Sequence, residues 1–324
     1  MNRLKIEPRG KRVLAVCAHP DDLEFYCGGT MARLAAAGAE IVLLLATAGD
    51  KGSFDPGMPG ARLAELRLEE ALRGAHVMGL SSVYCLGYPD GELAYGVSAA
   101  ELRCRIAGVM RAVRPNLLVT FDPWKRYELH PDHRRVGQVT LDARLAAKLP
   151  LYPVEARLPR RLPVAGGAGE GASDGGAGVR RVGGGAPGIE QPAAAQPSPG
   201  LRPWAIPEIW LFQPEEANLL AEIGPFFPAK LAALQAHASQ FLEEKDTLAA
   251  QLRSEAAEEG RRWLGKADAW NLAPQVLSVP VSAAGLAPAG GPAVDPAGGS
   301  AGLYEAFRRI MIVGSTAFSG QSAQ

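Results

Sequence analysis

Short apolar runs alternate with longer amphipathic stretches through the first half of the chain. The apolar runs "RVLAVCA", "EIVLLLAT", "SVYCLG" and "NLLVTFD" predict strands. Between and after them, the spacing of apolar residues predicts helices over 23–37, 61–79, 98–113 and 131–148. The second strand is apolar throughout, as in strands that are covered on both faces. The alternation therefore predicts an α/β fold in which a mostly parallel sheet lies between helices.

The second half of the chain is interrupted by segments that contain little to bury. Residues 164–200 consist largely of Gly, Ala and Pro, a composition typical of a disordered insertion. Ordered patterns resume near Trp204, with a strand at "PEIWLFQ", one or two helices over 228–265 and a last ordered piece at "LYEAFRRIMIV". We predict a catalytic core at 1–156, a disordered insertion at 157–203, and a completion of the same domain at 204–324 that includes C-terminal helices and a flexible 272–300 segment.

Charge and composition exclude several classes of function. The 34 basic and 34 acidic residues balance, so no overall field attracts nucleic acid or an anionic membrane. The longest apolar run is far shorter than the roughly 20 residues of a membrane helix, and no signal-peptide pattern is present. The 4 cysteines have no paired metal spacing. We therefore expect a cytoplasmic protein with reduced thiols.

Two clusters of histidine and aspartate follow predicted strands. "AHPDDLE" follows the first strand and "ELHPDHRR" follows the fourth, in a chain with only 5 histidines. Ligands bind at the carboxyl ends of parallel strands, so the pattern brings His19, Asp22 and His133 together at one edge of the sheet. Three such ligands and one open position are typical of a catalytic zinc, and Fe²⁺ can occupy the same ligands.

The remaining residues of the two clusters match the other tasks of amide hydrolysis. Asp21 can take a proton from the water and pass it to the leaving group. His130 can stabilise an oxyanion or protonate the amine, with Asp132 holding its imidazole in the required tautomer. For the paired Asp21 and Asp22 an N-cap role at the helix start is the alternative. No dinucleotide or P-loop motif is present, so no nucleotide cofactor is expected.

With these residues the chain resembles the LmbE-like, or PIG-L, family of zinc-dependent N-deacetylases. "AHPDDLE" and "HPDH" carry the resemblance, supported in order and spacing by "TAGDKG", "RLEEALRGAHVMGL", "LGYPDGEL" and "HASQ". The resemblance implies a Rossmann-like three-layer fold and removal of an acetyl group from an N-acetylglucosamine-type conjugate by metal-hydroxide attack on the amide. It implies the same metal ligands and the same base.

Three further residues are candidates for substrate contacts. The resemblance makes Arg67 a candidate for binding sugar hydroxyls, and an exposed helix charge is the alternative. Asp50 follows a predicted strand and can shape the pocket or form an Asx turn. His237 of "HASQ" can reach this site, reach the site of another subunit in a homo-oligomer, or lie on a solvent-exposed face.

Other functions stay open at this point. An amidase that cleaves a larger acyl group from a sugar–thiol conjugate would use identical chemistry in a larger pocket. A metal phosphoesterase would need two metals and more bridging carboxylates than the clusters offer. A silent sugar-binding protein would lack a ligand or the base, and neither is missing here.

Overall fold

The computed structural model describes residues 3–5, 7–164, 201–241, 245–264, 275–278 and 302–312. Its elements are β1 Arg3–Lys5, β2 Arg12–Cys17, α1 Asp22–Ala36, β3 Glu40–Thr47, α2 Gly60–Met78, β4 Ser82–Tyr88, α3 Ala99–Val113, β5 Leu117–Phe121, α4 Pro131–Lys148, β6 Arg161–Pro163, β7 Glu208–Phe212, β8 Leu219–Glu222, the 3₁₀ turn η1 Gly224–Phe226, α5 Phe227–Gln235, α6 Lys245–Trp263, β9 Gln275–Ser278 and β10 Tyr304–Met311.

The strands form one mostly parallel sheet, which confirms the predicted fold class. Their order across the described residues is β1-β9-β8-β10-β7-β5-β2-β3-β4-β6. Strands β2, β3, β4, β5 and β7 run parallel, while β10 is antiparallel to β7 and β8, and β6 is antiparallel to β4. Every residue of β5 and of β7 is buried, as expected for central strands that are covered on both faces.

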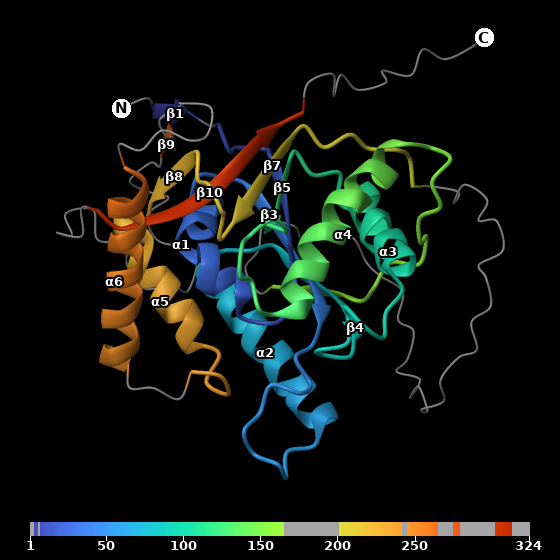
Figure 1. Ribbon diagram of the computed structural model, residues 1–324, viewed down its shortest axis with the longest axis horizontal. Helices are drawn as coiled ribbons and strands as arrows, with labels where there is room; N and C mark the ends of the chain where they lie inside the picture. Colours follow the sequence, from blue (N-terminus) through green and yellow to red (C-terminus); the bar gives the residue numbers. More distant parts are fainter. Residues whose placement is uncertain are drawn as a thin grey trace.

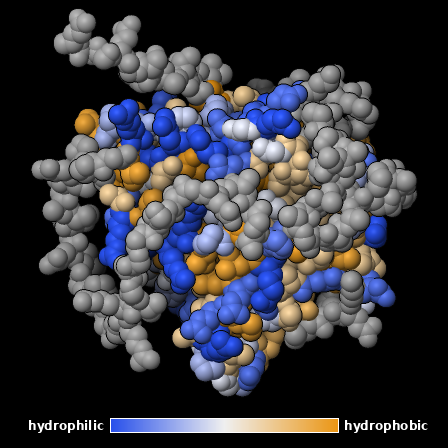
Figure 2. Space-filling model, turned by 180° about the vertical axis from the view of Figure 1, so that it is seen from behind, coloured by the Kyte–Doolittle hydropathy of each residue, from blue (hydrophilic) through white to orange (hydrophobic). Residues whose placement is uncertain are grey.

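Helices cover both faces of the sheet. Helix α1 packs against α2 and α5, and α6 packs against α5 and β10; α3 and α4 pack together on the other face (Figure 1). Within the described residues, no helix is both long and apolar enough to cross a bilayer. Hydrophilic and hydrophobic residues reach the surface side by side on the face seen from behind (Figure 2).

Helix α1 is broken at Cys27, whose backbone is not helical (φ −148°, ψ 24°). A buried ion pair closes the break. Lys230 donates from Nζ to the carbonyl oxygen of Phe25, at 2.6 Å, and pairs with Glu305 at 2.7 Å. The Glu305 carboxylate in turn accepts from the backbone N–H groups of residues 29 and 30. Residues from α5 and β10 thus satisfy the polar groups that the break leaves without helical partners.

The short strands were not predicted. Strand β6 lies inside the segment 157–203 that we predicted to be disordered, and β9 lies inside the predicted flexible segment 272–300. Both predictions are wrong for these strands, because three or four residues are too short to show a period in the sequence. Strands β1 and β8 were missed for the same reason. The Gly/Ala/Pro-rich residues 165–200 and residues 279–301 lie outside the described residues.

Candidate metal and catalytic site

The site lies where the order of the strands reverses. From β2 the chain proceeds to β3 and β4 on one side of the sheet, and later to β5 and β7 on the other. The carboxyl ends of β2 and β5 are neighbours, so the loops that follow them meet. The first loop carries His19, Asp21 and Asp22, and the second carries His130 and His133 at the start of α4.

Asp22 ties the turn after β2 to the second cluster. Its Oδ2 accepts from the backbone N–H groups of Ala18 and His19, at 3.0 and 2.7 Å. Its Oδ1 lies 3.2 Å from His133 Nε2. Burial alone would raise the pKa of Asp22, but hydrogen bonds from His133 and His19 hold that pKa well below its ordinary value. Asp22 is therefore an ionised carboxylate shared between two imidazoles.

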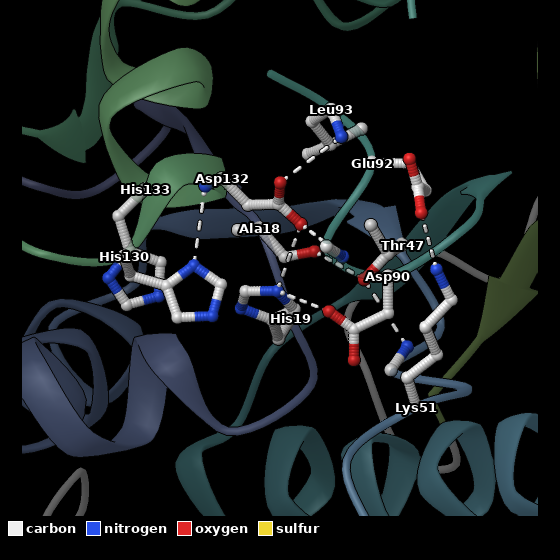
Figure 3. Close-up of polar contacts among 12 residues, drawn as sticks. Ala18, His19, Thr47, Lys51, Asp90, Glu92, Leu93, His130, Asp132 and His133 are labelled. Carbon is white, nitrogen blue, oxygen red and sulfur yellow. Dashed lines mark hydrogen bonds and ion pairs between the residues drawn. The ribbon is translucent and has the colours of Figure 1, made fainter. Parts of the chain in front are cut away.

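Three imidazoles cluster around this carboxylate, and one of them is held by further acids. Donor atoms of His19, His130 and His133 lie within 4.8 Å of one another. Nε2 of His19 lies 2.9 Å from Asp90 and 3.4 Å from Asp132. Figure 3 draws both contacts as dashed lines. Burial by itself would lower the pKa of His19, but the surrounding carboxylates, Asp132 first, hold it well above its ordinary value. The acids thereby fix the orientation of this ring.

Glu128 faces the far side of His133 and was missed by the sequence analysis. Its Oε1 lies 3.5 Å from His133 Nδ1 and accepts from the backbone N–H of His130 at 2.9 Å. His133 also stacks on Phe121, with ring centroids 4.3 Å apart. A carboxylate behind an imidazole orients it and strengthens it as a metal ligand. The only signal in the sequence was the position of Glu128, two residues before "HPDH".

The predicted pairing of the Asp132 carboxylate with His130 is wrong. That carboxylate accepts from the backbone N–H groups of Gly91 and Leu93 and lies beside His19 (Figure 3). His130 is instead oriented by main chain: its Nδ1 accepts from the backbone N–H of Asp132, at 3.3 Å, as the N-cap of α4. The reason is local. A side chain at the N-cap position, here His130, lies closer to the backbone N–H of Asp132 than to the side chain of Asp132.

Asp21 lies beside the cluster in an unusual backbone conformation and contacts a buried arginine. It is the N-cap of α1 with φ 102°, a value that few residues other than glycine adopt. Arg67 donates from Nη2 to Asp21 Oδ2 at 3.1 Å and to the carbonyl oxygen of Pro20 at 2.9 Å. Burial raises the pKa of Asp21 to about 7, although Arg67 opposes the rise. A carboxylate of this kind is suited to exchanging protons near neutral pH.

The structure does not place Arg67 on the surface, where a sugar would meet it. Its side chain is 4% exposed, and its Nη1 donates to the carbonyl oxygen of Gly49. A Cβ at Gly49 would lie 2.3 Å from that Nη1, so only glycine lets the guanidinium pass. The alternative interpretation from the sequence, an exposed helix charge, is therefore wrong, while the sugar contact stays a prediction. Arg67 holds Asp21.

The other two predicted substrate contacts also serve the protein interior. Asp50 accepts from the backbone N–H of Asp90 through Oδ1, at 2.8 Å, and so joins the loops after β3 and β4. His237 follows the end of α5, is fully buried, and has Nε2 3.3 Å from Glu24 Oε1. It presents no surface to a substrate and does not lie on a solvent-exposed face. His237 is therefore buried away from substrate, while the pocket-shaping role of Asp50 stays a prediction.

The donor set fits a metal ion of the first transition row. Imidazole nitrogens and carboxylate oxygens converge at this cluster, and nearly all of these residues are buried. A second group, His19, Asp90 and Asp132, shares one imidazole with the first. Because both oxygens of Asp132 accept from main chain, this second group is better suited to orienting His19 than to holding a separate ion.

Comparison with known proteins identifies the family. Residues 14–144 match the family model described as PIG-L, GlcNAc-PI de-N-acetylase. The diacetylchitobiose deacetylase of Thermococcus kodakarensis is 31% identical over 234 residues, which cover 72% of this chain and 72% of that protein. The chain belongs to the PIG-L family. A second relative in the family, the 1D-myo-inositol 2-acetamido-2-deoxy-alpha-D-glucopyranoside deacetylase of Thermobifida fusca, is 29% identical over 71% of this chain and 83% of that protein.

The fold of this chain is similar to that of a solved structure. The N,N'-diacetylchitobiose deacetylase of Pyrococcus horikoshii superimposes with a TM-score of 0.63 and 23% identity, covering 93% of this chain and 84% of that chain. At this identity the likeness concerns the fold. It supports the Rossmann-like arrangement expected from the resemblance.

Proposed function

We propose that this chain removes the acetyl group from an N-acetylglucosamine unit of a sugar conjugate, as a metal-dependent amide hydrolase. The observation that carries the proposal is that Asp22 contacts both His19 and His133, beside Asp21, a carboxylate whose pKa burial raises to about 7. Membership of the PIG-L family supports the proposal, because two relatives are named as sugar deacetylases.

His19, Asp22 and His133 would hold the metal. Zn²⁺ fits their nitrogen and oxygen donors best, and Fe²⁺ is the alternative. When bound, zinc would polarise the amide carbonyl and lower the pKa of a water to about 7. Two carboxylates orient the imidazole ligands, since Asp90 lies behind His19 and Glu128 lies behind His133.

Asp21 would act as the general base. It accepts the proton of the attacking water and then donates it to the amine as the C–N bond breaks, so that acetate and a free amine leave. Arg67 fixes the carboxylate on one side, while the Asp21 side chain stays 19% exposed. The strained backbone at Asp21 is maintained by this contact and by the turn that Asp22 closes.

His130 would stabilise the oxyanion. Because Nδ1 accepts the backbone N–H of Asp132, the proton of the neutral imidazole lies on Nε2. Burial, followed by the neighbouring His19 and His133, holds the pKa of His130 below its ordinary value, so the ring is neutral at pH 7. A neutral ring with Nε2–H is a donor for the oxygen of a tetrahedral intermediate.

The substrates to test follow from the relatives. We propose N,N'-diacetylchitobiose and the N-acetylglucosaminyl inositol, in both of which one polyhydroxylated ring is joined to the N-acetylglucosamine unit. The test is acetate release by wild type, by Asp21→Asn and by Asp142→Asn, a control on the exposed face of α4. We expect Asp21→Asn to lose about 10²–10⁴-fold in kcat with its metal retained. Full activity in Asp21→Asn would refute the assigned base, and no acetate from either sugar by wild type would refute the proposed function.

A further inference from the structure

A cavity of about 320 Å³ lies outside the cluster. It is bounded by α1 on one side and by α6 and the start of β10 on the other, the elements at the left of Figure 1. The loops that follow β5 and β7 close one end of it through Lys125 and Gln213. None of the residues predicted to hold the metal, act on the amide or contact the sugar lines it.

The cavity and the cluster share one wall, the side chain of Tyr26. Asp22 and Tyr26 are four residues apart and therefore point from the same face of α1. The Tyr26 ring lies 6.1 Å from the His133 ring and stacks on Phe212 at 5.3 Å. Gln213 follows Phe212 directly and lines the cavity. Tyr26 therefore borders both sites, and a molecule bound at the cluster would lie one side chain away from the cavity.

The cavity combines aromatic surface with polar side chains that are available to a ligand. Phe25, Tyr26 and Tyr304 contribute rings. Lys125 and Gln213 line the cavity, and within the described part of the chain neither side chain has a hydrogen bond or ion pair. Aromatic faces pack against the C–H groups of a sugar-like ring, while amide and ammonium groups bind its hydroxyls. The volume is at the lower end for small-molecule sites, about 300–1,000 Å³, and so favours one ring over a long chain.

We infer that this cavity binds the part of the substrate attached to the N-acetylglucosamine unit, as a single polyhydroxylated six-membered ring. The inference rests on the proposed function, because the acetamido group must lie at the cluster when the second ring lies beyond Tyr26. It identifies the determinants of substrate choice as α6, β10 and the loop after β7, all of which lie in the second half of the chain.

The test fills the cavity without touching the cluster. Ala256 lines the cavity from α6 and is 6% exposed, so Ala256→Phe places a ring in it. Ala250→Phe, on the exposed side of the same helix, is the matched control. Lys125→Met is a second variant, which removes a polar group from a loop and leaves the helices unchanged. The quantity measured is the ratio of kcat/KM for N,N'-diacetylchitobiose to that for free N-acetylglucosamine.

We expect the ratio to fall at least about tenfold in Ala256→Phe, to fall less in Lys125→Met, and to stay at the wild-type value in Ala250→Phe. An unchanged ratio in both cavity variants would overturn the inference while leaving the deacetylase activity in place. A ratio that falls instead in Trp124→Ala, whose ring is 66% exposed in the loop after β5, would also overturn it, because the second ring would then lie on the rim.

Failure of the proposed function is distinguishable from failure of the inference. If wild type releases acetate from neither sugar, calorimetric binding of N,N'-diacetylchitobiose to wild type and Ala256→Phe tests the cavity independently of turnover. Binding that Ala256→Phe abolishes and Ala250→Phe retains supports the inference. Absence of binding to wild type overturns it.

Discussion

Glu128 provides the sharpest test of how the cluster is built. Its Oε1 is the acceptor for the backbone N–H of His130 and lies 3.5 Å from Nδ1 of His133. Glu128→Gln preserves the shape and the acceptor but removes the negative charge. Glu128→Ala removes both and leaves Nδ1 of His133 without its carboxylate. The two variants therefore separate charge from position.

The expected loss follows from the contacts that each variant removes. Replacing a carboxylate behind a metal-bound histidine lowers metal affinity about 10–100-fold. Glu128→Gln keeps the hydrogen bond to His130, so we expect the lower end, about tenfold or 1.4 kcal/mol. Glu128→Ala also frees the loop that carries His130 and His133, so we expect the upper end.

The assay is zinc affinity, measured by competition with a chromogenic chelator. Glu216→Gln is the control, an exposed glutamate in the loop after β7. We expect its zinc affinity to equal that of wild type. Affinities that do not differ among wild type, Glu128→Gln and Glu128→Ala would refute the reasoning, because His133 would then need no carboxylate or would not hold the metal.

Three further predictions concern the base and the frame around it. In metal-free protein, ¹³C NMR of the Asp21 carboxyl should show a pKa of about 7, raised by burial. Zinc should lower this pKa, because a nearby cation favours the ionised carboxylate. A titration midpoint of about 4 in metal-free protein would contradict the prediction. Arg67→Lys keeps the positive charge but loses the three hydrogen bonds of the guanidinium. We therefore expect kcat to fall about tenfold or more while the zinc content stays the same. An unaltered kcat would show that Asp21 needs no support from Arg67. Lys230→Met leaves Glu305 buried without its partner and should lower the free energy of unfolding by about 3–5 kcal/mol in chemical denaturation. Lys51→Met, from an exposed pair, should lower it by less than about 1 kcal/mol, and equal losses in the two variants would contradict the account.

The sequence pattern was sufficient for the long elements and for the place of the site. Strands such as β3 and helices such as α2 show their period over many residues, and alternation of the two predicts a parallel sheet. The rule that ligands bind at the carboxyl ends of strands was enough to bring His19, Asp22 and His133 together.

What could not be predicted depends on packing between distant segments. Arg67 has the helical spacing of a surface charge, and only the tertiary fold shows that it is buried against Asp21. Asp132 and His130 are neighbours in sequence, but the loop after β4 takes the carboxylate of Asp132 through two backbone N–H groups. The position of β10 between β7 and β8, which supplies Glu305 to α1, has no local signal.

The central claim is that one metal at this cluster and Asp21 together hydrolyse the acetamide of a sugar conjugate. The most direct test is acetate release from N,N'-diacetylchitobiose and N-acetylglucosaminyl inositol, measured together with the metal content per chain. We predict release by protein holding one zinc, loss of release when a chelator removes the zinc, and recovery when zinc is restored. Release that persists after the metal is removed, or no release from either sugar by fully loaded protein, would contradict the claim.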